Sequence, residues 1–185
     1  DFHFGNTEKV NSAFKNAHHI SKASIRNNRV VVACMEPRSA VVEFEEKAGR
    51  YTVHVGCQGT FGMRKQLAAL LNVEPAKVRV LTKNVGGSFG MKSFAYPEYI
   101  CLLHAAKMLG KPIKWTDERS SSFLSDQQGR DHDVEGELAL DKDGNFLAVR
   151  LSLFSNMGGY LAAVGPNMAT NNMVKNITSV YKTPA

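Results

Sequence analysis

A glycine-rich segment near the middle of the chain most constrains how the chain can fold. It follows the apolar run Val78–Leu81, which predicts a strand, and it precedes a helix predicted to begin near Pro97. Glycines permit positive φ angles and leave no Cβ to block a flat ligand, and N–H groups between a strand and a helix can converge on an anion. We therefore expect a phosphate-bearing cofactor here, with the ring of Phe89 held inside the turn. The predicted cofactor-binding residues of this loop are Gly86, Gly87, Ser88, Phe89 and Gly90.

The loop matches neither standard nucleotide-binding motif. A Walker A loop needs a glycine at the sixth position counted from Gly86, where Met91 stands, and a dinucleotide-binding fingerprint needs a glycine in place of Val85. An independent nucleotide-binding domain stays an alternative hypothesis. A tight structural turn between strand and helix is another, and the loop alone does not separate that turn from a cofactor site.

Hairpins and two amphipathic helices make up most of the recognisable pattern. Met63, Leu67 and Leu71 recur at helical spacing, and Asp143-Gly144 is a hairpin signal. The expected helices are a short one before His18 and two longer ones over 61–71 and 97–110. The expected strands are 29–34, 41–46, 51–55, 78–81, 112–116, 131–140 and 146–154. Hairpins interleaved with helices predict an α+β fold with a mixed sheet, and we expect residues 1–185 to form a single compact unit.

Composition narrows the class of protein. The chain has 185 residues, 43% of them hydrophobic, which suits a globular domain with a real core. No apolar run approaches the roughly 20 residues that cross a bilayer, so we expect a soluble chain and no membrane partner. The cysteines, Cys34, Cys57 and Cys101, form no CxxC pair, which fits a reducing, cytoplasmic compartment. By themselves they cannot supply the four thiolates of an iron–sulfur cluster.

The charge of the chain is basic but dispersed. The net charge is +6, and lysines and arginines are scattered among acidic residues, so we expect no nucleic-acid partner. The charged residues Asp126, Arg130, Asp131 and Asp133 are expected to form solvated surface or to face a companion chain. The chain does not begin with Met, and both of its ends look truncated.

Two polar clusters at strand ends bear on the glycine loop. Pro37 forces Glu36 towards an extended conformation, and Glu36 and Arg38 would then project to one side, where they could pair. Gln58 closes another predicted strand just before a helix, and its amide can both donate and accept a hydrogen bond. Such an amide could bind a cofactor oxygen without adding charge, although a structural role is common for a loop glutamine. Gln58 therefore joins the predicted cofactor-binding residues.

Seven segments are informative together: 35–38, Gln58, 67–73, 78–80, 86–92, 111–115 and 129–131. Taken in order, they resemble the molybdenum-binding large subunit of the xanthine dehydrogenase, aldehyde oxidase and carbon monoxide dehydrogenase family. Each segment is weak evidence alone, but their order and spacing cover nearly the whole chain. The branch that the chain resembles most is the bacterial carbon monoxide dehydrogenase-like one, because Ser93 follows the loop lysine where purine oxidases usually carry an acidic residue.

The resemblance implies an oxidoreductase that carries molybdenum on molybdopterin, usually in the cytosine dinucleotide form in bacteria. Such enzymes hydroxylate heteroaromatic rings or aldehydes with oxygen from water, or oxidise carbon monoxide. It also implies that Gln58 hydrogen-bonds an oxo ligand of the metal and that the backbone at Phe89 and Gly90 binds near the pterin. FAD and [2Fe–2S] carriers would lie on partner subunits or domains. No residue of this chain would be a metal ligand, since the metal is bound through the pterin.

One departure and one omission limit what the resemblance carries over. The family usually has a third glycine where Ser88 stands, so its Cβ could narrow the approach to the loop. The family's catalytic glutamate would lie beyond Ala185, so this chain would be an internal fragment of a molybdopterin-binding domain, inactive alone and without a catalytic residue. A non-catalytic binding or assembly module that keeps the fold is the main alternative.

Overall fold

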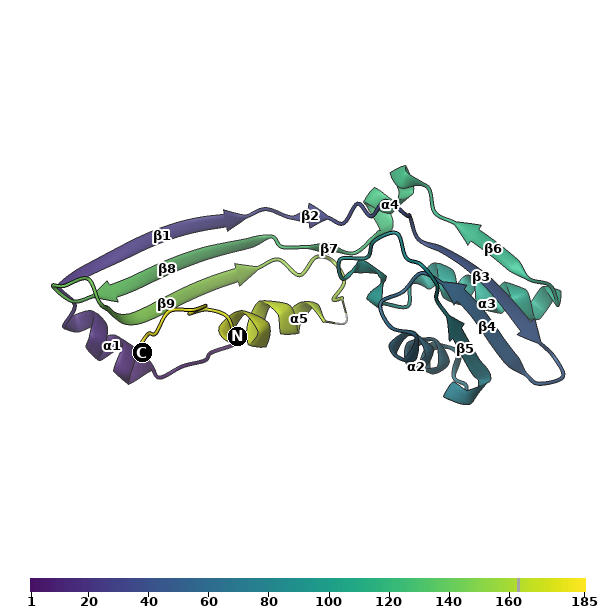
Figure 1. Cartoon of the computed structure of the whole chain (residues 1–185), viewed down its shortest axis with the longest axis horizontal. Helices are drawn as coiled ribbons and strands as arrows, with labels where there is room; N and C mark the ends of the chain where they lie inside the picture. The colour runs from purple at the N-terminus through teal and green to yellow at the C-terminus, as the bar shows by residue number, and fades with distance from the viewer. Residues whose placement is uncertain (163) are drawn as a thin grey trace. The chain divides into compact units, whose positions relative to one another are not determined.

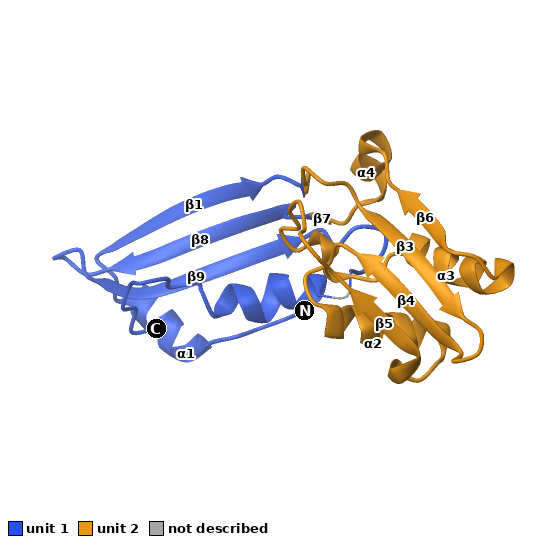
Figure 2. Ribbon diagram, turned by 45° about the vertical axis from the view of Figure 1, so that its right-hand side comes forward, with its two compact units in different colours: residues 1–30, 129–185 blue, residues 31–128 orange. Residues whose placement is uncertain are grey.

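The computed structural model describes residues 1–162 and 164–185, and the chain divides into two compact units. Unit 1 comprises residues 1–30 and 129–185, and unit 2 comprises residues 31–128 (Figure 2). This differs from the single compact unit expected from the sequence. The difference arises because a strand near the N-terminus pairs with the C-terminal hairpin, with Ser24 opposite Glu135, so that both ends of the chain build the same unit.

Unit 2 is built on a four-stranded mixed sheet (Figure 1). In order across the sheet, its strands are β5 (Val78–Leu81), β4 (Arg50–Val55), β3 (Ser39–Glu45) and β6 (Ile113–Thr116). The predicted β3–β4 hairpin is present, β6 pairs antiparallel with β3, and β5 pairs parallel with β4. Val42 and Val53 face each other fully buried while Glu43 is exposed, which is the period-two alternation of a sheet with one covered face.

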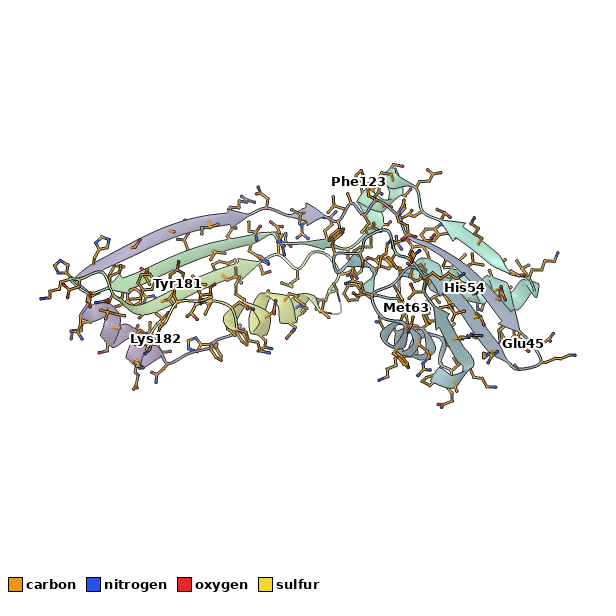
Figure 3. All side chains as sticks on the ribbon, in the orientation of Figure 1. Glu45, His54, Met63, Phe123, Tyr181 and Lys182 are labelled. Atoms are coloured by element: carbon orange, nitrogen blue, oxygen red, sulfur yellow. The ribbon has the colours of Figure 1, made fainter. Side chains whose placement is uncertain are left out.

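Two helices pack against this sheet as the sequence predicted. They are α2 (Thr60–Leu71) and α3 (Pro97–Leu109). Each helix ends on a residue in the left-handed region, Asn72 at φ 54° and Gly110 at φ 61°, the conformation that commonly closes helices. Met63 of α2, which Figure 3 labels, is among the buried core residues. Shorter helices in this unit are η1 (Pro75–Lys77), η2 (Met91–Ser93) and α4 (Arg119–Ser125).

Unit 1 contains a long three-stranded antiparallel sheet and a small core. The sheet runs in the order β1 (His19–Asn27), β8 (His132–Leu140), β9 (Phe146–Ser155). The helix α1 (Thr7–Lys15), which the sequence predicted before His18, is capped by Asn6, whose side chain accepts a hydrogen bond from the N–H of Lys9. The core of this unit consists of three buried residues, Phe14, Ala139 and Ala148.

The sequence did not predict every element of unit 1. Strand β1 is not among the strands expected from the sequence, because all its residues are exposed and it lacks a clear alternation of apolar side chains. The C-terminal part contains α5 (Gly165–Asn167) and η3 (Met168–Asn172), where no pattern had been recognised. Two-residue strands, β2 (Val30–Val31) and β7 (Gln128–Gly129), occur where the chain passes between the units. Among the described residues, no helix is long and apolar enough to cross a membrane.

A buried guanidinium, that of Arg38, organises unit 2. Arg38 is 0% exposed, donates to both oxygens of Glu98 at 2.9 and 3.0 Å, and donates to Asp126 at 2.5 Å. A longer contact of 3.4 Å reaches Asp117, and the guanidinium carbon lies 3.8 Å from the ring centre of Tyr96. Burial alone would lower the pKa of Arg38, but the hydrogen bonds to Glu98 and Asp126 outweigh burial and raise that pKa.

This cluster corrects two predictions. Glu36 and Arg38 do not pair, because the chain bends at Met35 and Glu36 and the two side chains reach different partners. Asp126 was expected on solvated surface, but it is only 4% exposed and is bound to Arg38. A guanidinium in the core requires carboxylates beside it, and this requirement draws Asp126 inward.

Arg38→Met should destabilise the chain by about 3–5 kcal/mol, because it leaves Glu98, Asp117 and Asp126 without their cation. Urea unfolding followed by the fluorescence of Trp115, the single tryptophan, would measure the loss. The matched control is Arg50→Met, whose ion pair with Glu45 is between exposed side chains and should contribute about 0–1 kcal/mol. A loss below about 1 kcal/mol for Arg38→Met would contradict the organising role of this guanidinium.

Candidate functional site

The glycine loop after β5 has the backbone conformation that its sequence predicts. Gly87 and Gly90 adopt φ angles of 95° and 94°, which only glycine adopts readily. Gly86 has an ordinary φ, but a Cβ built on it would lie 2.5 Å from the Cβ of Glu36. Phe89 also has a positive φ, 50°, a strained value for a residue with a side chain. Three glycines and one strained residue thus let the main chain fold closely against Glu36.

Gln58 and the loop meet, as the sequence led us to expect. Its side-chain oxygen, Oε1, accepts hydrogen bonds from the N–H of Gly90 at 2.7 Å, from Oγ of Ser93 at 3.1 Å and from Oγ of Ser88. Its main-chain N–H donates to the carbonyl of Lys92 at 3.2 Å. Gln58 is therefore fixed to the loop by both its main chain and its side chain.

Several hydrogen-bond donors at this site remain unused. Among the residues that the structure describes, neither the side-chain nitrogen of Gln58 nor the N–H groups of Gly87, Ser88 and Phe89 make a hydrogen bond. Helix α2 begins immediately after Gln58 and Gly59 and has no side-chain cap, so its first N–H groups add to these donors. The arrangement offers a surface of donors suited to an acceptor-rich, anionic ligand.

An ion pair between Lys92 and Glu36 holds the loop in place. The ammonium of Lys92, which is 1% exposed, lies 2.7 Å from Oε2 of Glu36. The same carboxylate oxygen accepts the N–H of Gly86 at 2.9 Å, and the N–H of Glu36 donates back to the carbonyl of Gly86 at 3.0 Å. The hydrogen bond from Lys92 lowers the pKa of Glu36, helped by the N–H of Gly86 and opposed by burial. Glu36 is therefore held as a carboxylate.

The prediction for Phe89 is wrong in one respect. Its ring was expected inside the turn, but the side chain is 80% exposed. The positive φ of Phe89 turns the ring outward, and a Cβ built on Gly87 would lie 3.0 Å from the ring atom Cε2. The ring therefore covers Gly87 and leaves the loop open to solvent on its other side.

Two supporting residues were missed from the sequence. Ser93 donates to Gln58, and Lys92 is a buried cation within the loop region. The short helix η2, which carries both residues, follows directly on Gly90. The sequence signal for this turn towards Gln58 was the glycine itself, which has a positive φ in the structure. Among the described residues, no group of three His, Cys, Asp or Glu side chains could hold a metal ion.

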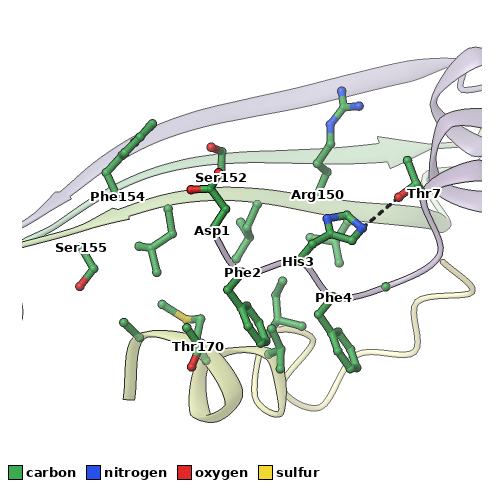
Figure 4. Close-up of a pocket in the computed structure, with 18 of the residues that line it drawn as sticks. Asp1, Phe2, His3, Phe4, Thr7, Arg150, Ser152, Phe154, Ser155 and Thr170 are labelled. Atoms are coloured by element: carbon green, nitrogen blue, oxygen red, sulfur yellow. Dashed lines mark hydrogen bonds between the residues drawn. The ribbon is translucent and has the colours of Figure 1, made fainter. Parts of the chain in front are cut away.

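A cavity of about 840 Å³ in unit 1 is a weaker candidate (Figure 4). Phe2, Phe4 and Phe154 give it an apolar lining, and none of the predicted cofactor-binding residues line it. Two of its polar side chains are already engaged: His3 is hydrogen-bonded to Thr7, as Figure 4 shows, and Arg150 is paired with Glu137. The site formed by Gln58 and the glycine loop offers the richer chemistry.

Comparison with known proteins connects this chain to a family. A family model described as a molybdopterin cofactor-binding domain matches residues 1–185. The chain is 32% identical over 182 residues to the gamma subunit of the 6-hydroxypseudooxynicotine dehydrogenase complex of Paenarthrobacter nicotinovorans, covering 95% of this chain and 22% of the relative. It is 28% identical over 162 residues to the carbon monoxide dehydrogenase large chain of Hydrogenophaga pseudoflava, covering 88% of this chain and 20% of the relative.

A solved structure agrees with these relatives. The crystal structure of quinoline 2-oxidoreductase from Pseudomonas putida 86 superimposes with a TM-score of 0.88 at 25% identity, covering 95% of this chain and 22% of that one. The chain spans about a fifth of the length of the relatives that it matches. The predicted α+β fold is confirmed, both by the mixed sheets of the structure and by this neighbour.

Gly86→Ala should destabilise the chain by about 1–3 kcal/mol, because the added methyl group would overlap Glu36 and push it from the loop. Gly62→Ala is the matched control. Gly62 lies in α2 with open space around the position of a Cβ, so this change should stabilise the chain by about 0.5–1 kcal/mol. Urea unfolding of both variants measures the difference, and equal effects would contradict the close packing of Gly86 on Glu36.

Glu36→Gln should show a pH-dependent loss of stability. Because the folded-state pKa of Glu36 is lowered, its contribution is fully present above the ordinary glutamate pKa of about 4.3 and is lost as the pH falls through the lower, folded-state pKa. The difference in urea midpoint between wild type and Glu36→Gln should therefore shrink from pH 7 to pH 3. The matched control is Glu43→Gln, at an exposed position. A difference that grows on acidification would contradict the pairing with Lys92.

Proposed function

Since this chain belongs to the molybdopterin cofactor-binding domain family, we propose that Gln58 and the glycine loop form one wall of the cofactor site in a molybdenum oxidoreductase subunit. The observation that carries the proposal is the use of the Gln58 oxygen by the loop, which leaves its nitrogen and several main-chain N–H groups as donors. The proposed cofactor-binding residues are Gln58, Gly86, Gly87, Ser88, Phe89 and Gly90.

The donor set fits the cofactor chemically. The phosphate of molybdopterin and the oxygen ligands of molybdenum are hydrogen-bond acceptors, and the site offers donors without adding charge. The N–H groups of Gly87, Ser88 and Phe89 and the first turn of α2 suit a phosphate or pterin oxygen. Gly90 has no side chain that could block a flat ligand. The space beside it is open, because a Cβ built there would meet nothing within 4 Å.

Each part of the site would have a distinct task. When bound, the cofactor supplies the two-electron redox chemistry and the transfer of oxygen derived from water. The side-chain nitrogen of Gln58 would stabilise negative charge on an oxygen ligand of the metal, and the loop would orient the pterin. Gln58 and the loop residues carry no group that could act as a general base. The nearby Glu36 and Lys92 do not serve as one either, because they form an ion pair with each other. We therefore expect the chain by itself to be inactive.

Electrons would leave through other chains or domains. Cys34, Cys57 and Cys101 are free thiols, fewer than the four that an iron–sulfur cluster requires. The proposal therefore places FAD and [2Fe–2S] carriers on partner subunits or domains, in agreement with a relative whose name describes it as one subunit of a complex. We further propose a cytoplasmic location, the cytosine dinucleotide form of the pterin, and carbon monoxide, an aldehyde or a heteroaromatic ring as substrate. Relatives named for carbon monoxide and for nicotine, which contains a heteroaromatic ring, support the first and the last of these substrate classes.

Gln58→Ala in the longer subunit should reduce turnover by about 10²-fold, the scale of losing one preorganised donor. The matched variant is Gln58→Glu, which keeps an oxygen acceptor for the loop and removes the nitrogen donor. Turnover would be measured with whichever of carbon monoxide, an aldehyde or an N-heteroaromatic ring the wild type oxidises, together with the pterin content of each protein.

Both variants should lose turnover, whereas the loop should be retained in Gln58→Glu. Unchanged turnover in both would remove Gln58 from the site. A wild-type subunit that binds the pterin but turns over none of the three substrates would support the binding-module alternative. Micromolar binding of ATP or NAD, without pterin, would support an independent nucleotide-binding domain.

A further inference from the structure

We propose that Ser88 and Ser93 are positioning residues that orient the amide of Gln58 and commit its nitrogen to the cofactor. The inference rests on the proposed function, and it assigns a role to two hydroxyl groups of this chain. Both serines are half-buried and lie on opposite sides of Gly90 in the sequence. Both hydroxyl groups lie within hydrogen-bonding distance of the same atom, Oε1 of Gln58.

The direction of each hydrogen bond follows from elementary chemistry. The N–H of Gly90 can only donate, so the atom of Gln58 that it contacts at 2.7 Å must be the amide oxygen. The N–H of Lys92 donates to Oγ of Ser88 at 3.0 Å, so the proton of Ser88 is free to point to Gln58. The amide of Gln58 therefore has one orientation, with its oxygen towards the loop.

This orientation leaves the nitrogen for another ligand. The amide oxygen has two lone pairs and already accepts from Gly90, Ser88 and Ser93, so it has no capacity for a further donor. The amide nitrogen can donate two hydrogen bonds and, among the described residues, makes none. Gln58 can consequently meet a ligand only as a donor, which is the polarity that an oxygen ligand or a phosphate requires.

Ser88 also connects this amide to the rest of the loop. Its hydroxyl donates to Gln58 and accepts from Lys92, and Lys92 in turn holds Glu36, which binds Gly86. Only a side chain that donates and accepts at once can complete this chain of hydrogen bonds. Alanine or glycine at position 88 would remove one of the three donors to Oε1 of Gln58 and would leave the N–H of Lys92 without this acceptor, whereas threonine would keep the hydroxyl.

The test compares Ser88→Ala, Ser88→Thr and Ser93→Ala in the longer subunit. Hydrogen–deuterium exchange of a peptide spanning residues 86–93 reports on the loop, and the released pterin per chain reports on the cofactor. Ser88→Ala should speed exchange of this peptide by about tenfold, the effect of losing one hydrogen bond, and should lower pterin content at least threefold. Ser93→Ala should have a smaller effect in the same direction.

Rescue by threonine separates positioning from a general structural effect. Ser88→Thr should show the same exchange rate and the same pterin content as the wild type, because threonine keeps the hydroxyl group. Ser120→Ala is the control, because Ser120 is exposed on α4 and, among the described residues, its side chain makes no hydrogen bond. Unchanged exchange and pterin content in Ser88→Ala would overturn the role of Ser88. Faster exchange with undiminished pterin would overturn its link to the cofactor, and a wild-type subunit without pterin would instead refute the proposed function.

Discussion

The burial of one guanidinium constrains the rest of unit 2. Arg38 lies at the start of the central hairpin, and its carboxylate partners come from the beginning of α3 and from both ends of α4. An unpaired charge in this position would be costly, so these elements must converge on it for the unit to fold. Arg38 also fixes the chain two residues after Glu36. The carboxylate beneath the glycine loop therefore stands where the buried cluster places it.

The site divides its hydrogen-bonding capacity between its own structure and a ligand. Acceptors on the protein side, the oxygen of Gln58 and the carboxylate of Glu36, are used to hold the loop. Donors remain: the nitrogen of Gln58 and the N–H groups at the turn of the loop. A side-chain amide that presents only its nitrogen, together with unused main-chain N–H groups, favours an oxygen-rich ligand without the use of a charged side chain.

Local signals in the sequence predicted the elements that depend on local chemistry. The helices α2 and α3 formed close to the predicted ranges 61–71 and 97–110, and the hairpin of β8 and β9 formed around Asp143 and Gly144. The meeting of Gln58 with the loop was also predicted, because both follow strand ends. What the sequence could not show were pairings between distant residues: the partner of Arg38 at Asp126, and the strand β1, whose exposed residues carry no apolar alternation.

The division into two units has a consequence for biosynthesis. Unit 2 is one uninterrupted stretch, Val31–Gln128, whereas β1 must wait for β8, with Ser24 and Glu135 separated by 111 residues. Domains tend to fold as units while the ribosome is still at work, so unit 2, with Gln58 and its loop, can begin to fold before β8 is available to pair with β1. Until then β1 lacks its partner strand, and an unpaired strand can pair with the wrong one.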